Sequence, residues 1–206
     1  YFKSIEQIRE SFAKYASIVG RDGTVIYNID DENTVISAGK VDANKISFGL
    51  SATADMRAVN IDLNVFPIEF DVLYRGEHFV HVSLPSFGKH SVYNALAAIA
   101  ASISCGISAE DIVTGLKNFK GAGRRMELKG EINGARVYDD YGHHPTEVKA
   151  TLMGARTACQ GRLICVFQPH TYSRTKALFN DFVRELQKPD LVVLAEIYAA
   201  RERNTT

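Results

Sequence analysis

In the C-terminal third of the chain, runs that are apolar at every position alternate with amphipathic runs. This alternation is the sequence feature that constrains the fold most strongly. Three apolar runs predict strands at Ala135–Asp139, Arg162–Gln168 and Leu191–Ile197, with helices beginning near Pro145 and Ser173. Strands that are apolar at every position are typical of a parallel sheet covered on both faces. With right-handed crossovers, this pattern predicts a three-layer, Rossmann-like parallel α/β domain.

The first part of the chain has a different pattern. Residues 4–16 place their apolar side chains at helical spacing, and the short run Val25–Asn28 predicts a strand followed by a polar turn. Between residues 45 and 84, four short runs separated by Asp, Asn, Pro and Gly predict strands joined by hairpins, with one turn at residues 75–77. This region is therefore expected to be a small strand-rich layer.

Two helices are predicted next. Leu96 and Ile99 belong to an apolar stripe in a helix that ends at Gly106. Ser108, with Asp111 three residues later, indicates the N-cap of the second helix. The glycine-rich, charged stretch that follows predicts a domain linker. We therefore expect a first domain over residues 1–122, a hinge over 123–130 and a second domain over 131–206.

Composition excludes some classes of protein. Lys plus Arg and Asp plus Glu number 24 each in 206 residues, so no global field favours nucleic acid or a membrane surface. No apolar run is long enough to span a bilayer. Cys105, Cys159 and Cys165 lack metal-type spacing and are interpreted as reduced core thiols of a cytoplasmic protein. The first residue is not Met, and we expect the chain to be part of a longer protein.

Side chains that bind or transfer charge follow each predicted strand of the last domain. The three segments are "DDYGHHP" at 139–145, "QPHTYSR" at 168–174 and "EIYAARE" at 196–202. Because ligands of open parallel sheets sit beyond the carboxyl ends of the strands, these segments are expected to line one cleft.

The segment 139–145 supports a binding role and a purely structural one. Asp140 is suited to accept hydrogen bonds from a ribose diol, Gly142 allows close backbone approach, and the N–H groups near Pro145 attract anions. The alternative is a capped turn in which Asp139 is satisfied locally and His144 is the helix N-cap. The neighbouring strand ends favour the binding role.

A zinc site is a further alternative for the same segment. Asp140, His143, His144 and His170 are plausible ligand types. However, adjacent histidine side chains diverge, and the chain has no Cys pair. A nucleotide or substrate role is therefore preferred to zinc.

The other two strand ends offer cationic and anionic groups. Ser173 as an N-cap would place Arg174 in the first helical turn, where its guanidinium can grip a carboxylate or phosphate. Arg201 and Glu202 are suited to bind a carboxylate and an ammonium. The alternative for each is a solvated surface charge.

Three more polar residues lie outside the strand ends. His90 and Asn94 share one face of the helix that precedes Gly106 and can contact a base or a metal-bound phosphate. Arg125, in the linker, can reach a phosphate held by the other domain. The alternatives are a polar residue near a helix start and a solvated linker arginine.

Five segments, taken together and in order, resemble the Mur ligase family, and within it the branch that adds L-alanine to UDP-N-acetylmuramate. They are "GKHSVYNALAAIA", "FKGAGRRMELKGE", "VYDDYGHHPTEVKATL", "FQPHTYSRTKALF" and "EIYAARERNT". The resemblance implies that residues 1–122 are the rear part of a central ATP-binding domain. It implies that residues 131–206 are the front part of a C-terminal Rossmann-like ligase domain.

The resemblance also implies the reaction. It is ATP-dependent ligation of L-alanine to the lactoyl carboxylate of UDP-N-acetylmuramate through an acyl phosphate, in cytoplasmic peptidoglycan synthesis. ATP and Mg²⁺ are implied, with the glycine-rich phosphate loop and the main metal ligands expected upstream of these residues. The 206 residues alone are therefore expected to be inactive, and no nucleic acid or membrane partner is expected.

Residue roles are implied in the same way. The resemblance places the nucleotide against His90, Asn94, Arg125 and Asp140, and the reacting groups beside Arg125, Asp140, His143 and His144. It places the muramoyl and alanine substrates near His170, Tyr172, Arg174 and Glu202, and it implies no metal ligand among these. Two positions depart from the family pattern: Ser91 stands where many members have Asn, and Thr171 where some have Arg.

Two other classes of function stay open at this point. The "DDYGHH" cluster would suit a metal-dependent hydrolase, which metal analysis would reveal. A non-catalytic nucleotide- or muropeptide-binding module would bind without turnover.

Overall fold

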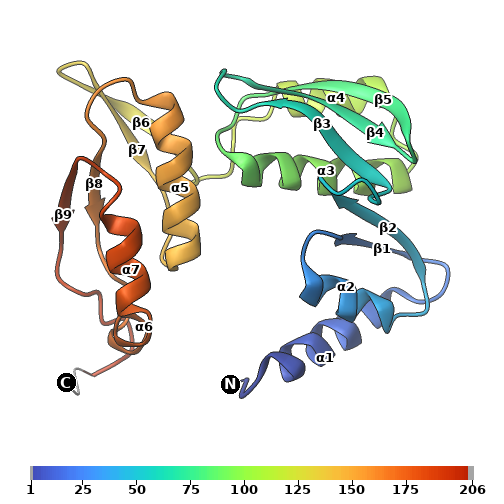
Figure 1. Cartoon of the computed structure of the whole chain (residues 1–206), viewed down its shortest axis with the longest axis horizontal. Coiled ribbons are helices and arrows are strands. Elements are labelled where there is room, and N and C mark those ends of the chain that lie inside the picture. The colour runs from blue at the N-terminus through green and yellow to red at the C-terminus, as the bar shows by residue number, and fades with distance from the viewer. Residues whose placement is uncertain (1, 204–206) are drawn as a thin grey trace. The chain divides into compact units, whose positions relative to one another are not determined.

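The computed structural model describes residues 2–203 and divides the chain into two compact units (Figure 1). The first unit comprises the chain up to Pro85 together with His90–Phe119. The second comprises Ser86–Lys89 together with the chain from Lys120 on. The short segment Ser86–Lys89 belongs to the second unit because Phe87 packs edge-on against Tyr138, with ring centroids 6.2 Å apart.

The first unit is built on a five-stranded sheet in the order β1-β2-β3-β4-β5. β1, β2 and β3 are parallel neighbours, whereas β3, β4 and β5 form an antiparallel meander. Its elements are α1 (Ile5–Ala16), β1 (Thr24–Asn28), α2 (Glu32–Gly39), β2 (Asn44–Gly49), β3 (Met56–Asp62), β4 (Ile68–Tyr74), β5 (Glu77–Leu84), α3 (Lys89–Ser104) and α4 (Ala109–Lys117). A short 3-10 turn, Ser17–Val19, follows α1.

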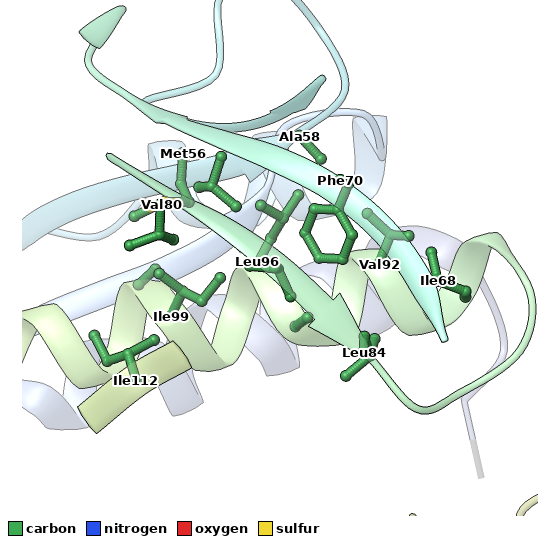
Figure 2. Close-up of a cluster of buried hydrophobic side chains, with 14 of the residues drawn as sticks. Met56, Ala58, Ile68, Phe70, Val80, Leu84, Val92, Leu96, Ile99 and Ile112 are labelled. Atoms are coloured by element: carbon green, nitrogen blue, oxygen red, sulfur yellow. The ribbon is translucent and has the colours of Figure 1, made fainter. Parts of the chain in front are cut away.

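The core of this unit lies between the strands and α3. Every second residue of β4 is buried, beginning with Ile68, and Figure 2 shows Phe70 directed toward the helix that carries Val92 and Leu96. Ile112 of α4 joins the same cluster. The period-two pattern of the strand and the i, i+3, i+4 pattern of the helix therefore meet in one core, as apolar burial requires.

Several sequence predictions for this unit are confirmed. α1 begins after Ser4, whose hydroxyl accepts a hydrogen bond from the backbone N–H of Gln7. Ser108 caps α4 and accepts from the N–H of Asp111. The tight turn between β4 and β5 places Arg75 at φ 51° and Gly76 at φ 87°, as a two-residue hairpin turn requires.

Two expectations for this unit were wrong. The predicted polar turn after β1 contains α2, which Asp31 caps by accepting from the N–H of Thr34 at 3.0 Å. Of the predicted hairpins between residues 45 and 84, the first is wrong, since β2 and β3 are parallel, whereas β3–β4 and β4–β5 are antiparallel as predicted. β1 and β2 are also parallel, and α2 connects them. The unit therefore contains a β-α-β crossover that eight helical residues were too few to reveal.

The second unit combines an antiparallel hairpin with a parallel pair of strands. Its elements are β6 (Glu127–Ile132), β7 (Ala135–Asp139), α5 (Pro145–Ala158), β8 (Ile164–Phe167), α6 (Tyr172–Ala177), α7 (Phe179–Leu186) and β9 (Leu191–Leu194). β6 pairs with β7 and β8 pairs with β9. Val148 and Leu152 of α5, Phe167 of β8 and Phe182 of α7 form the core cluster.

The predicted α/β class and parallel strands are confirmed, but the prediction of strands covered on both faces was wrong for the described residues. Cys165 and Phe167 of β8 point toward the helices, whereas Val166 between them is 73% exposed. Within residues 2–203, β7 and β8 are not hydrogen-bonded to each other. A cavity of about 630 Å³ lies between them and is lined also by α5.

β6 begins at Glu127, inside the predicted hinge 123–130, whose bounds stay a prediction. Other expectations for this unit need correction. The single helix predicted from Ser173 is two helices that meet at Leu178. Cys105 in the first unit is exposed, so that cysteine is not a core thiol.

No helix in the described part of the chain is long and apolar enough to cross a membrane.

Candidate functional site

The loop between β7 and α5 is held by the carboxylate of Glu147. This carboxylate accepts from the backbone N–H groups of His143 at 3.0 Å and His144 at 3.1 Å. His144 is the N-cap of α5, since its Nδ1 accepts from the N–H of Thr146 at 3.3 Å. The structural alternative for His144, a helix cap, is therefore what the structure shows, and the cap requires an unprotonated Nδ1.

Burial raises the pKa of Glu147, but the backbone hydrogen bonds from His143 and His144 and the electrostatic attraction of His143 and Arg125 outweigh it. The net result is a pKa below the ordinary value of 4.5. Glu147 is therefore an anion at neutral pH and orients both histidines of the loop through their backbone.

The two aspartates at the end of β7 make different contacts. Asp140 accepts from the N–H of Met126 at 3.0 Å through Oδ2 and from the N–H of Gly142 at 2.8 Å through Oδ1. Asp139 forms an ion pair of 3.4 Å with Arg124. Each carboxylate oxygen has a further lone pair, so Asp140 fixes the loop and can still accept a hydrogen bond from a ligand.

Both arginines of "GRR" are anchored within the second unit. The guanidinium of Arg124 lies 4.7 Å above the ring centroid of Tyr141, and its carbonyl accepts from the N–H of Tyr141 at 2.8 Å. Arg125 Nη2 lies 3.5 Å from Glu147 Oε1 and the side chain stays 48% exposed. The Arg125 guanidinium therefore has donors available for an anion while its position is set by Glu147.

Aromatic rings connect the three strand ends that the sequence placed at one cleft. The ring of His143 lies 5.9 Å from that of His170, which lies 5.4 Å from that of Tyr198. His170 Nδ1 is 3.4 Å from Nη1 of Arg174. The segments 139–145, 168–174 and 196–202 therefore meet in space, as parallel-strand geometry predicted.

The start of α6 differs from its prediction. Ser173 is not the N-cap, because the helix begins at Tyr172 and follows Thr171, which makes no side-chain capping bond. Instead the N–H and hydroxyl of Ser173 both donate to Glu202, with the N–H at 2.9 Å. Through these hydrogen bonds the carboxylate of Glu202 caps the helix and is occupied within the protein. The same bonds lower the pKa of Glu202.

Thr171 has φ 71° and ψ 142°, a conformation that β-branched residues rarely adopt. Its N–H donates to the carbonyl of Tyr198 at 2.9 Å, and its carbonyl accepts from the N–H and hydroxyl of Thr175. Backbone strain of this kind persists only where surrounding contacts impose it, and it is frequent at binding sites.

His90 and Asn94 lie in the first unit, near the N-terminal end of α3, and both are exposed. They are one turn apart on the same helix, as predicted. Ser91 between them is buried and belongs to the packed side of the helix.

Among residues 2–203, no group of three or more His, Cys, Asp or Glu side chains is arranged to hold a metal ion. The cavity between β7 and β8 is lined by Asp139 and Asp140 at one end but not by the histidines of the loop. The candidate site is therefore the polar surface at the strand ends and not that cavity.

Sequence reasoning missed Glu147, Arg124 and Tyr198. The signal for Glu147 was present in "HPTE", which has a glutamate three residues after the N-cap as in a capping box, although His replaces the usual Ser or Thr. Arg124 and Tyr198 act through ring contacts between distant segments, which spacing along the chain does not express.

Comparison with known proteins bears directly on these segments. The family model described as "Mur ligase middle domain" matches residues 1–102, and the one described as "Mur ligase, glutamate ligase domain" matches residues 124–205. The chain belongs to the Mur ligase family. The second match contains the β7–α5 loop, both arginines and all three strand ends.

Relatives and solved structures agree. A UDP-N-acetylmuramate–L-alanine ligase of Clostridium acetobutylicum is 45% identical over the whole chain, and that of Caldanaerobacter subterraneus is 42% identical. A crystal structure of the UDP-N-acetylmuramate–alanine ligase of Thermotoga maritima superposes with a TM-score of 0.77 at 27% identity, over 95% of this chain and 42% of that one. The chain spans 45% of the length of both curated relatives.

Proposed function

We propose that these residues are part of an ATP-dependent ligase that joins L-alanine to the lactoyl carboxylate of UDP-N-acetylmuramate in cytoplasmic peptidoglycan synthesis. The main support is the meeting of three charged strand ends in a chain 45% identical to an enzyme named for that reaction. In the proposed reaction, the substrate carboxylate attacks the γ-phosphorus of ATP and ADP leaves. The alanine amine then attacks the acyl carbon, phosphate leaves and the amine loses a proton.

The proposal includes a domain assignment. Residues 1–122 would be the rear of the ATP-binding domain, 123–130 the hinge, and 131–206 the front of the C-terminal ligase domain. Because relatives are about twice as long, we propose that the phosphate loop and the Mg²⁺ ligands lie in the rest of the enzyme and that these residues alone do not turn over.

The site geometry is compatible with ATP and a carboxylate substrate. Arg125 presents an exposed guanidinium, and Asp140 keeps acceptor capacity beside it at the end of β7. We propose that Arg125 and Asp140 contact the nucleotide phosphates and ribose, and that His90 and Asn94 contact its base side. His143 and Arg174 would then bind the muramoyl carboxylate and alanine together with His144, His170 and Tyr172, whereas Glu202 would position this loop through Ser173.

The test is alanine-dependent ADP release by a full-length ligase carrying these residues. Arg125→Ala should lower kcat/KM by about 100-fold or more, since it removes a positive charge proposed to stabilise the transferred phosphoryl group. Asp140→Asn should lower kcat/KM by about tenfold or more, since it weakens the proposed charge-assisted hydrogen bonds to the ribose. Arg184→Ala and Asp181→Asn are matched controls, because these two exposed residues of α7 form an ion pair with each other, with Nη1 of Arg184 3.2 Å from Oδ1 of Asp181. Neither residue belongs to the β7–α5 loop. Near-normal turnover of folded Arg125 and Asp140 variants would refute their roles, and absence of alanine-dependent ADP release by the wild type would refute the reaction.

A further inference from the structure

The carboxylate of Asp30 connects three elements of the first unit. Asp30 follows the carboxyl end of β1, and its Oδ2 accepts from the N–H of Leu50 at 2.6 Å and its Oδ1 from the N–H of Ser51 at 3.1 Å. Leu50 and Ser51 directly follow β2. The hydroxyl of Tyr93, near the N-terminal end of α3, donates to the same Oδ2 at 2.8 Å.

The neighbouring aspartate has a separate role. Asp31 caps α2 through the N–H of Thr34 and is the ordinary N-cap that its sequence position suggests. Asp30 instead turns toward β2, where a Cβ on Gly49 would come within 2.7 Å of its Oδ2. The close approach of Asp30 to the end of β2 therefore depends on glycine at position 49.

Tyr93 is held as a hydrogen-bond donor. Burial, and then the hydrogen bond and charge of Asp30, raise the pKa of Tyr93 to about 12. The phenol therefore keeps its proton throughout the neutral range, and its bond to the carboxylate is charge-assisted.

Asn94 is the next residue of α3, and His90 lies one turn earlier on the same exposed side. The core contacts of Val92 and Leu96 hold α3 against the sheet. The hydrogen bond from Tyr93 to Asp30 adds a polar contact that ties this end of the helix to the residues that follow β1 and β2. An ångström of misplacement at such a position is enough to lower activity strongly.

We propose that Asp30 is a positioning residue, which acts through Tyr93 to fix His90 and Asn94 relative to the carboxyl ends of β1 and β2. The inference rests on the proposed function, because His90 and Asn94 are assigned to the nucleotide there. Neither Asp30 nor Tyr93 is assigned a contact with substrate.

The experiment compares Asp30→Asn and Tyr93→Phe with the control Asp31→Asn in a full-length ligase carrying these residues. Losing one charge-assisted hydrogen bond should raise KM for ATP about tenfold, and the Kd of a non-hydrolysable ATP analogue by a similar factor, with a smaller effect on kcat. The double variant should raise KM and Kd no further than the single variant with the larger increase, since both changes remove the same contact. Asp31→Asn should leave both constants within about twofold.

A second readout separates positioning from folding. Amide hydrogen exchange at Leu50 and Ser51 should accelerate in Asp30→Asn but not in Tyr93→Phe, while melting of the whole protein changes little. Unchanged ATP constants in both variants, or an equal loss in Asp31→Asn, would overturn the inference. If the wild type binds the analogue but never releases ADP with alanine, the proposed function fails, and the analogue's Kd alone then decides the role of Asp30.

Discussion

Replacing Glu147 should loosen the β7–α5 loop in two graded steps. Glu147→Gln keeps an oxygen that can accept from the N–H groups of His143 and His144, but it loses the charge. Because charge-assisted hydrogen bonds are roughly twice as strong as neutral ones, we expect a loss of about 1 kcal/mol in the free energy of unfolding. Glu147→Ala removes the acceptor altogether and should cost about 2 kcal/mol. The side chain is 32% exposed, so water replaces part of the lost contact and larger losses are not expected.

The pH dependence follows from the lowered pKa of Glu147. A carboxyl group with a lowered folded-state pKa stabilises the protein above its unfolded-state pKa, and this contribution disappears as the pH falls through the folded-state value. The difference between wild type and Glu147→Gln should therefore be full at pH 7 and should shrink below about pH 4.5.

Urea unfolding at pH 7 and pH 4, with amide exchange at His143 and His144, measures both effects. Glu131→Gln on the exposed strand β6 is the matched control, because the same chemical change is made in the same unit away from a helix N-terminus. Equal stability of Glu147→Ala and wild type at pH 7, or a difference that grows on acidification, would refute the capping argument.

Two further predictions concern His81 and Thr171. The hydrogen bond that His81 donates to Asp71, with Glu69 accepting from the other ring nitrogen, raises the pKa of His81. The stabilisation by His81 is therefore complete below about pH 6.5 and is lost as the pH rises through the higher folded-state value. Because His81 is 59% exposed, the loss should stay under about 1 kcal/mol, and His81→Gln should flatten the stability profile between pH 6 and 8; an unchanged slope in urea titrations would contradict this. Thr171→Gly should raise stability by about 1 kcal/mol, since relief of positive-φ strain exceeds the entropy cost of glycine, and a lower melting temperature than wild type would show that the strain is absent.

The parts of the fold that followed from the sequence are those with a clear period. Ile68 and Phe70 alternate on β4, and Leu96 and Ile99 repeat on α3, so burial of these side chains could be inferred without coordinates. The cap at Ser108 was equally local, because it needs only the next three residues.

The parts that escaped depend on contacts between distant segments. α2 has eight residues and includes Val35 and a terminal Gly39, so its own helical signal is weak. It is held by α1, since Arg9 Nε donates to Asn33 Oδ1 at 2.9 Å and Ser37 donates to the carbonyl of Arg9. No period within residues 32–39 contains that information.

The candidate site divides in the same way. The rule that parallel strands end at one edge correctly brought together the three segments that carry His143, His170 and Tyr198, although Tyr198 itself was not a candidate. It did not show which carboxylate shapes the loop, because Glu147 acts from inside the following helix. It also could not show that Glu202 is occupied by Ser173, since that contact joins two separate loops.

Within residues 2–203, β7 and β8 each have one edge that pairs with no other strand, and these edges affect the association of the protein in solution. Unpaired N–H and C=O groups along an apolar strand are a template on which another chain can add a strand, and sheets usually protect such edges with lysine, proline or a covering segment. Ile164 and Val166 of β8 are exposed and carry no charge to discourage this pairing. Association between copies through strand addition is therefore the hazard to control, by low concentration and early addition of a covering partner, whenever these residues are produced by themselves.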